Sequence, residues 1–241
     1  MFKIIEFDEL ISTNKFALEK IANYPSGTVI RANKQTAGRG RFDRKWVSDN
    51  ADNCYLSFIL KPDKKYQKVF PNITQYLSIV VCQELLRYGI KASIKWPNDI
   101  LVDGKKIAGI LSETSFSGEK FNGIVVGLGI NLNLTQKDLS KIDIPATSIK
   151  LETGKDVDSK KFVEYLAKRF FGEYETLLRK GFKYFRAQYI SYTDFIGKNV
   201  TIKNPEITDL GIAINVCEDG ALEILTEEGE IKKVISGDVI L

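Results

Sequence analysis

The sequence predicts an α+β protein, in which a mixed, largely antiparallel sheet is flanked by helices and followed by a small C-terminal β-barrel. Three observations point to this class. Residues 93–133 are rich in strand formers and contain Asp103-Gly104, a pair typical of a two-residue hairpin turn. Residues 72–88 and 159–189 carry apolar side chains at helical spacing. After Ile196, short strands alternate with turn residues.

The first part of the chain alternates strands with helices. Before residue 90 we expect strands at 3–7, 28–32 and 54–60, and helices after residue 12 and at 72–88. The helix at 72–88 places its apolar residues on one face, and Gly89 suits its C-terminal end. The strand at 28–32 leads directly into a basic loop.

The middle of the chain predicts adjacent antiparallel strands. After the Asp103-Gly104 turn, strict alternation places Lys106 and Ala108 on one face of the strand and Ile107 on the other. Because small residues leave room on their face, we expect Lys106 to meet a ligand there.

The long pattern at 159–189 predicts one helix that closes the large domain. The segments NVTIK, GIAINV, ALEILT and EIKKVIS then indicate the strands of the small barrel. We therefore assign residues 1–193 to a large catalytic domain and residues 194–241 to a small β domain.

Composition excludes several classes of protein. Hydrophobic residues make up 44% and charged residues 27% of the 241 residues, which is ordinary for a globular protein and not for a disordered one. The net charge is only +4, because 35 Lys and Arg oppose 31 Asp and Glu, so a dedicated nucleic-acid binder is disfavoured. We expect no membrane segment and no secretory signal. Cys54, Cys82 and Cys217 lack metal-site spacing, so we expect reduced core thiols in a cytoplasmic protein.

Ser12-Thr13-Asn14 is the first of four segments that combine polar groups with glycines or helix ends. These side chains are suited to cap a helix, whose N-terminus is also a hydrogen-bond donor site, so capping and ligand binding are compatible. The second segment is the loop QTAGRGRFDRKW at 35–46, which has three interpretations: a solvated loop, a nucleic-acid contact or a clamp for one anion.

The clamp interpretation depends on the combination of residue types in this loop. Arg39 and Arg41 offer planar forks for carboxylate or phosphate, while Gly38 and Gly40 let backbone N–H groups approach an anion closely. Trp46 adds a flat surface on which a purine or another ring can stack.

The third and fourth segments are also open to two interpretations. The third segment comprises residues 95–99, KWPND, and residues 104–110. It is either a turn followed by a solvated hairpin end, or a strand face on which Lys106 contacts a ligand. The fourth segment, residues 127–133 (GLGINLN), reads as a strand whose glycines pack closely, and Asn131 just past it can bind phosphate or Mg²⁺. A dinucleotide-binding interpretation fails, because no helix begins after these glycines.

Together and in this order, the segments resemble the biotin–protein ligases. The matching motifs are S-T-N at 12–14, Q-T-A-G-R-G-R at 35–41 with Arg44 and Trp46, K-W-P-N-D at 95–99, G-K-K-I-A-G-I-L at 104–111 and G-L-G-I-N at 127–131. The end of the chain is similar to that family's SH3-like domain. Asp43 departs from the pattern, since many members have Gly there, and this leaves the closure of the loop open.

The resemblance implies a biotin/lipoate ligase-like catalytic domain with ATP and biotin as substrates and Mg²⁺ as cofactor. Biotin is activated as biotinyl-5′-AMP and then transferred to a lysine of a biotin carboxyl carrier protein. The implied biotin-binding residues are Ser12, Thr13, Asn14, Gln35, Gly38, Arg39, Gly40, Arg41, Lys106 and Gly109. The implied ATP-binding residues are Arg39, Arg41, Trp46, Asn98, Lys106 and Asn131. The implied catalytic residues are Lys106, Arg39, Arg41 and Asp99, with Asp99 assisting deprotonation of the acceptor lysine.

Three alternatives stay open at this point. A lipoate or octanoate ligase uses the same scaffold, but the Arg-rich loop at 35–46 favours biotin. A nucleic-acid-binding module and a non-catalytic sensor of a small ligand are the others. Because the first expected strand starts at residue 3, we expect no DNA-binding domain before it and no repressor activity. Exposed sheet edges make a homodimer plausible.

Overall fold

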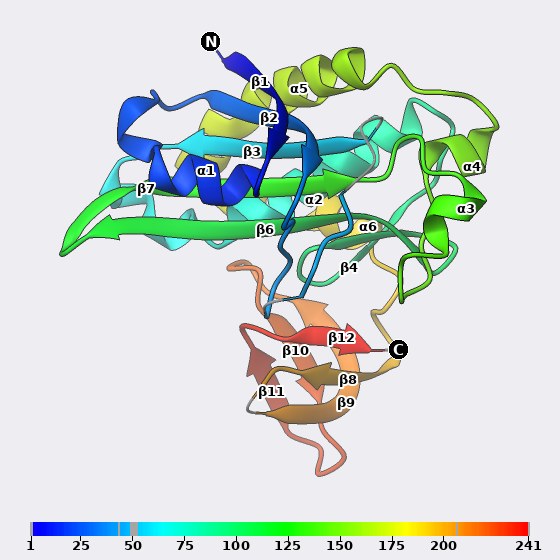
Figure 1. The fold of residues 1–241 in the computed structure, drawn as a ribbon. Helices are drawn as coiled ribbons and strands as arrows, with labels where there is room; N and C mark the ends of the chain where they lie inside the picture. The colour runs from blue at the N-terminus through cyan, green and yellow to red at the C-terminus, as the bar shows by residue number, and fades with distance from the viewer. Residues whose placement is uncertain (1, 43, 49–52, 206, 241) are drawn as a thin grey trace.

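The computed structural model describes residues 2–42, 44–48, 53–205 and 207–240, and it contains two β-sheets. One sheet is mixed and seven-stranded, and the other is antiparallel and five-stranded (Figure 1). Helices flank the larger sheet. The predicted α+β class is therefore confirmed. None of the helices in this part of the chain has the length and apolar content needed to span a lipid bilayer.

The large sheet places the glycine-containing strands at its centre. Its strands, in spatial order, are β1 (Lys3–Leu10), β2 (Thr28–Gln35), β3 (Cys54–Leu60), β7 (Lys120–Ile130), β6 (Lys105–Ser117), β5 (Asp99–Val102) and β4 (Ser93–Lys95). β1 and β2 pair in parallel, and the other neighbours are antiparallel. The parallel pair needs a crossover, which α1 (Thr13–Glu19) and the 3₁₀ helix η1 (Ile21–Asn23) supply.

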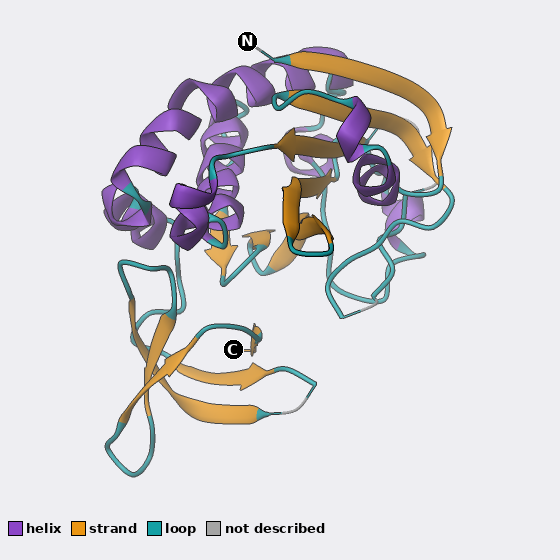
Figure 2. Ribbon diagram, turned by 90° about the vertical axis from the view of Figure 1, so that its left-hand side faces the viewer, coloured by secondary structure: helices purple, strands orange, loops and turns teal. Residues whose placement is uncertain are grey.

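Helices cover both faces of this sheet. On one face, α2 (Asn72–Leu86) and α5 (Ser159–Lys180) bury their apolar side chains in the main hydrophobic core, and Figure 2 shows the long helices gathered on that side. α1 packs on the opposite face over a smaller apolar cluster. The remaining helical elements are η2 (Lys64–Val69), α3 (Gln136–Leu139), α4 (Ile149–Thr153), η3 (Phe182–Tyr184) and α6 (Arg186–Ser191).

The single helix predicted over 159–189 is wrong. α5 ends at Lys180, because Gly181 adopts φ 73° and ψ 176°, a conformation outside the helical region and open mainly to glycine. The chain then turns through η3 into α6. The apolar spacing continues across the break, which is why periodicity does not reveal it.

A β-bulge also overturns the predicted alternation around Lys106. The Asp103-Gly104 turn forms as expected, with φ of 47° and 74°. However, Ile100 pairs with Ala108 and Leu101 with Lys106, so Ile107 is inserted without a partner of its own. Ile107 and Ala108 both point into the core. Gly109, rather than Ala108, shares the face of Lys106, since a Cβ there would lie 3.1 Å from Lys106 Cε.

The C-terminal sheet docks against the large domain through a turn. Its strands are β8 (Asn199–Lys203), β9 (Thr208–Val216), β10 (Leu222–Leu225), β11 (Ile231–Val234) and β12 (Asp238–Ile240), of which β12 was not predicted from the sequence. The carbonyl of Gly220 accepts hydrogen bonds from Trp96 Nε1 (3.0 Å) and Gln75 Nε2 (2.7 Å). Asn72 Nδ2 donates to the carbonyl of Asp219 (2.7 Å). β12 lies near the basic loop (Figure 1), where Asp238 forms ion pairs with Arg41 and Arg44.

Candidate active site

A cavity of about 670 Å³ lies at the face of β6 and β7, beside the basic loop and β12. It brings together nearly all the residues expected from the sequence. Those that line it are Ser12, Thr13, Asn14, Gln35, Arg39, Gly40, Arg41, Trp46, Asn98, Asp99, Lys106, Gly109 and Asn131. Residues from five separated segments of the chain therefore share one site.

Two glycines form the floor of this cavity. Gly109 of β6 and Gly129 of β7 are paired in register, and the indole of Trp46 lies across both. A Cβ at residue 129 would lie 2.3 Å from Trp46 Cε2, and one at residue 109 would lie 3.0 Å from Cζ3. Trp46 Nε1 is buried and has no hydrogen-bond partner within the described residues. Because buried donors are normally paired, this N–H is available to a ligand acceptor.

The polar residues before and within the first turn of α1 form one end of the cavity. Ser12 is the N-cap, and its Oγ accepts from the backbone N–H of Lys15 (3.4 Å). The backbone N–H and Oγ1 of Thr13 both donate to Gln35 Oε1, at 2.8 and 3.2 Å. The helix-cap interpretation is therefore correct for Ser12, and the cap residue also lines the cavity.

Asn14 is buried, and its amide is fully engaged with the protein. Its Nδ2 donates to the carbonyl of Leu111 (3.0 Å) and to Glu113 Oε2 (2.8 Å). Its Oδ1 accepts from Ser57 Oγ (2.5 Å). Gly127 permits this placement, because a Cβ there would lie 2.2 Å from Asn14 Oδ1.

The basic loop folds back on itself as a short hairpin. The backbone N–H of Gly40 donates to the carbonyl of Arg44 (2.7 Å), and that of Trp46 donates to the carbonyl of Gly38 (3.0 Å). Gly38 does not line the cavity. A Cβ at Gly38 would lie 2.5 Å from both Ser48 Oγ and the carbonyl oxygen of Trp46, so this glycine lets the two arms of the hairpin approach. Asp43 lies outside the described residues.

The arginines of this loop contact different carboxylates. Arg39 Nη2 lies 2.9 Å from both oxygens of Glu113 on β6. Arg41 Nη1 donates to Asn98 Oδ1 (3.0 Å) and to Asp238 Oδ1 (2.8 Å). Arg44 Nη1 lies 2.5 Å from Asp238 Oδ2. The loop is thus held on one side by the large sheet and on the other by the C-terminal sheet.

Burial perturbs the guanidinium of Arg41. Desolvation lowers the pKa of its guanidinium, while the negative charges of Asp238 and Asp99 act in the opposite direction. An arginine starting from such a high pKa keeps its charge at neutral pH. Arg41 is therefore a half-buried positive charge facing the cavity.

Lys106 forms an ion pair with Asp99 inside the cavity. Lys106 Nζ lies 2.8 Å from Asp99 Oδ1, and both side chains are less than one-fifth exposed. The ammonium also lies 5.4 Å from the centroid of the Trp46 ring. On the backbone, the N–H of Lys106 donates to the carbonyl of Pro145 (2.8 Å), which ties this strand to the adjacent wall.

Asn98 and Asn131 hold neighbouring backbone segments. Asn98 Nδ2 donates to the carbonyl of Ile110 (2.9 Å), which leaves its Oδ1 to accept from Arg41. Asn131 Nδ2 donates to the carbonyl of Thr147 (3.0 Å). Each amide thus orients another part of the cavity, whether or not it also contacts a ligand.

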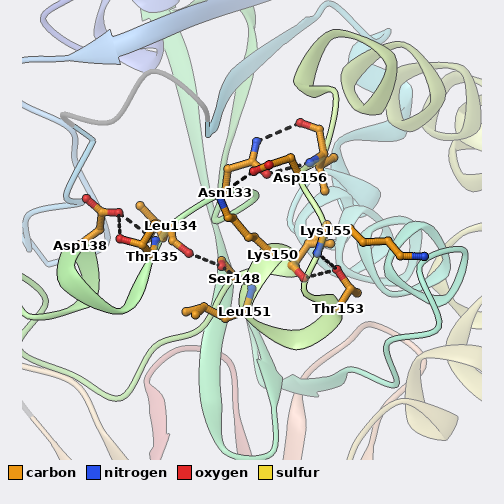
Figure 3. Close-up of polar contacts among 12 residues, drawn as sticks. Asn133, Leu134, Thr135, Asp138, Ser148, Lys150, Leu151, Thr153, Lys155 and Asp156 are labelled. Atoms are coloured by element: carbon orange, nitrogen blue, oxygen red, sulfur yellow. Dashed lines mark hydrogen bonds and ion pairs between the residues drawn. The ribbon is translucent and has the colours of Figure 1, made fainter.

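A wall that sequence patterns did not indicate lies beside Lys106. It comprises residues 141–144 and Ala146. The segment that carries this wall is fastened at both ends, since Ser148 Oγ donates to the carbonyl of Leu134 (2.7 Å) and Thr135 with Asp138 forms a capping box at α3 (Figure 3). Asn133 also exchanges two hydrogen bonds with Val157.

The sequence analysis did not identify two carboxylates that contact the basic loop, Glu113 and Asp238. Glu113 shares a strand face with Leu111 and Gly109. Alternation along β6 therefore predicts that Glu113 faces the cavity side, provided that Gly109 is placed there. Asp238 stands 197 residues from Arg41 in the chain, and no local pattern indicates its position.

Comparisons with known proteins agree with this architecture. Residues 6–131 match the biotin/lipoate A/B protein ligase family, and residues 195–241 match the biotin protein ligase C-terminal domain. The bifunctional ligase/repressor BirA of Bacillus subtilis is 36% identical over 241 residues, covering 99% of this chain and 74% of that protein. The biotin–[acetyl-CoA-carboxylase] ligase of Paracoccus denitrificans is 32% identical over 221 residues, covering 88% and 89%.

Solved structures show the same likeness. The biotin protein ligase of Aquifex aeolicus in complex with biotin and ATP superimposes with a TM-score of 0.87 at 33% identity, covering 99% of this chain and 97% of that one. The chain belongs to the biotin/lipoate A/B protein ligase family.

Proposed function

We propose that this protein is an ATP-dependent biotin–protein ligase, which forms biotinyl-5′-AMP and transfers biotin to a lysine of an acceptor protein. The observation that carries the proposal is the cavity itself. It joins the donors and acceptors of the α1 end, the glycine floor, and the Lys106 and Arg41 cations on one continuous surface. Relatives named as biotin ligases and a neighbour bound to biotin and ATP support this function over lipoate ligation.

Biotin lies in the cavity beside the Trp46 indole, which covers the glycine floor. Ser12, Thr13 and Gln35 supply hydrogen-bonding groups for the ureido ring at the α1 end, with Asn14 behind them. Gly109 and Gly129 let the Trp46 indole lie close against the sheet, which keeps the rest of the cavity open for the bicyclic ring and the valeryl chain, and Gly40 lies in the loop beside it. In this arrangement the carboxylate points toward Lys106 and Arg41.

The first step needs positive charge around the reacting phosphate. A biotin carboxylate oxygen attacks the α-phosphorus of ATP, and the bond from phosphorus to the bridging oxygen breaks to release pyrophosphate. Lys106 and Arg41 stabilise the negative charge that builds on the phosphate oxygens. Lys106 is held in place for this by Asp99 and by its backbone bond to Pro145.

In the second step the acceptor lysine amine attacks the carbonyl of the mixed anhydride, and AMP leaves. The incoming ammonium must first lose a proton, and Asp99 is the carboxylate placed nearest to Lys106 to accept it. The anhydride must be shielded from water until the acceptor docks, because water would hydrolyse it.

ATP binds on the side of Trp46, Asn98 and Asn131, all of which line the cavity. Mg²⁺ suits this site as a companion of the triphosphate rather than as a resident ion. Among the described residues there is no cluster of three possible metal-ligating side chains, and Asp99 and Asp238 are ion-paired. Mg²⁺ is commonly held by phosphates with one or two carboxylates, and it would neutralise phosphate charge.

The acceptor we propose is a biotin carboxyl carrier protein, modified in the cytoplasm. Pairing of two copies is proposed through the edges of the large sheet, where β1 and β4 are the terminal strands of the described sheet. We place the boundary between the two domains at residues 193 and 194, between α6 and β8.

Biotin-dependent exchange of labelled pyrophosphate into ATP tests the proposed function. We expect exchange with biotin as the only added acid, and loss of exchange in Lys106→Ala. Exchange that requires lipoate and ignores biotin would show that the scaffold serves the other ligase reaction. Retention on heparin that falls steeply with salt, without any exchange, would instead favour a nucleic-acid module.

A further inference from the structure

Glu113 joins two parts of the cavity that come from distant segments. Its Oε2 accepts a hydrogen bond from Asn14 Nδ2 (2.8 Å), at the first turn of α1. Both of its carboxylate oxygens lie 2.9 Å from Arg39 Nη2, in the basic loop. One carboxylate on β6 therefore contacts both the ring end of the cavity and the loop above it.

The contact with Asn14 fixes the orientation of a buried amide. Asn14 Nδ2 faces two acceptors, Glu113 and the Leu111 carbonyl, while its Oδ1 faces the hydroxyl of Ser57. A flipped amide would point its oxygen at both acceptors, so only one orientation satisfies all three bonds. Glu113 thus helps to fix the orientation of Asn14 at the ring end of the cavity.

The contact with Arg39 separates the roles of the two loop arginines. Arg41 faces Asn98 and Asp238 at the cation end, next to the Lys106 pair. Arg39 faces Glu113 instead, and its side chain is 42% exposed against 18% for Arg41. Arg39 is consequently placed to hold the loop rather than to receive the reacting phosphate.

We propose that Glu113 is a positioning residue, which orients Asn14 at the ring end and, through Arg39, holds the basic loop across biotin. The proposal rests on the proposed ligase function. It predicts that Glu113 and Arg39 act as one unit on biotin binding and leave the chemical step to Lys106 and Arg41.

A double-mutant cycle on the biotin KM and kcat of pyrophosphate exchange tests this unit. Glu113→Gln keeps an acceptor for Asn14 but removes the negative charge that pairs with Arg39. Because an exposed ion pair contributes little, we expect its loss to raise the biotin KM about two- to fivefold. Arg39→Ala should raise the biotin KM by a similar factor. The Glu113→Gln/Arg39→Ala double variant should raise the KM no further than either single variant, and kcat should stay within about twofold of the wild type in all three. Glu113→Ala also removes one of the two acceptors of the buried Asn14 amide, so we expect about a tenfold or larger rise in KM. Glu119→Gln, near the tip of the same hairpin, is the matched control.

Trypsin cleavage of the ligand-free protein provides a readout that does not need activity. Glu113→Gln should be cut in the basic loop several-fold faster than the wild type and Glu119→Gln. Equal cleavage rates, multiplicative KM effects in the double variant, or a kcat loss above about tenfold in Arg39→Ala alone would each overturn the proposal. Absence of biotin-dependent exchange in the wild type would instead count against the ligase function and leave the cleavage test in force.

Discussion

Replacing Gly129 by Ala is expected to move Trp46 off the glycine floor. A Cβ at this position would lie 2.3 Å from Trp46 Cε2 and 2.6 Å from Nε1, closer than the 3.0 Å below which Cβ contacts essentially never occur. The colliding atoms belong to a rigid ring. The indole, and with it the basic loop, must therefore shift by about 1 Å to restore ordinary contact.

The size of the effect follows from this collision. Overpacking typically costs about 1–3 kcal/mol, and we expect the lower end because Trp46 sits on a loop that can move. For a chain of this length a loss of about 1 kcal/mol lowers Tm by about 2–4 °C. Activity should fall more, because a displacement of about 1 Å near the chemistry can cost about a hundredfold.

Calorimetric melting and biotin-dependent pyrophosphate exchange measure the two effects. The control is Gly172→Ala on α5, where a Cβ meets nothing within 4 Å and helix propensity predicts a gain of about 0.5–1 kcal/mol. In a protein that already carries Trp46→Ala, adding Gly129→Ala should lower neither Tm nor the exchange rate any further, because the colliding ring is gone. The described packing would be refuted if Gly129→Ala had the Tm and exchange rate of the control. It would also be refuted if Gly129→Ala lowered Tm and exchange rate as much in the Trp46→Ala protein as in the wild type.

Four further predictions concern other parts of the site and core. Lys106→Met should slow single-turnover adenylate formation about 10²- to 10³-fold, as for loss of a transition-state contact; an unchanged rate would remove Lys106 from the chemistry. Asp238→Asn should raise the ATP KM several-fold with little change in Tm, because two loop arginines lose their shared counter-charge. Burial raises the pKa of Cys54 and Cys82 to about 12, so iodoacetamide at pH 8 should label neither thiol in the folded protein. Since these thiols ionise at lower pH when unfolded, the free energy of unfolding should fall as pH rises from about 9 toward 12, which urea titrations at pH 8 and 10 can measure.

Much of the site can be predicted because its motifs are local. Segments at 35–46, 95–99 and 127–131, which combine polar residues with glycine or proline, stand out from the apolar strands around them, and adjacency of β2, β3, β7 and β6 brings them to one face. Within such segments residue type alone singles out candidate residues such as Lys106, which lines the cavity.

Other features depend on tertiary contacts that no local pattern encodes. The bulge at Ile107 moves Gly109 onto the cavity face, although the residues around it are ordinary strand formers. Asp238 reaches Arg41 from the C-terminal sheet, which also docks onto Trp96 through the turn at Gly220. The break at Gly181 is hidden because apolar residues on both sides keep the same spacing.

The docking of β12 against the basic loop has a consequence for the order in which the protein matures. Protein chains are synthesised from the N-terminus, and their domains generally fold as units in that order. Asp238 follows every other residue of the cavity in the chain, so the large sheet can form on the ribosome while Arg41 and Arg44 still lack their counter-charge. The pocket is completed only when the second sheet has emerged and docked, which links the onset of activity to late synthesis.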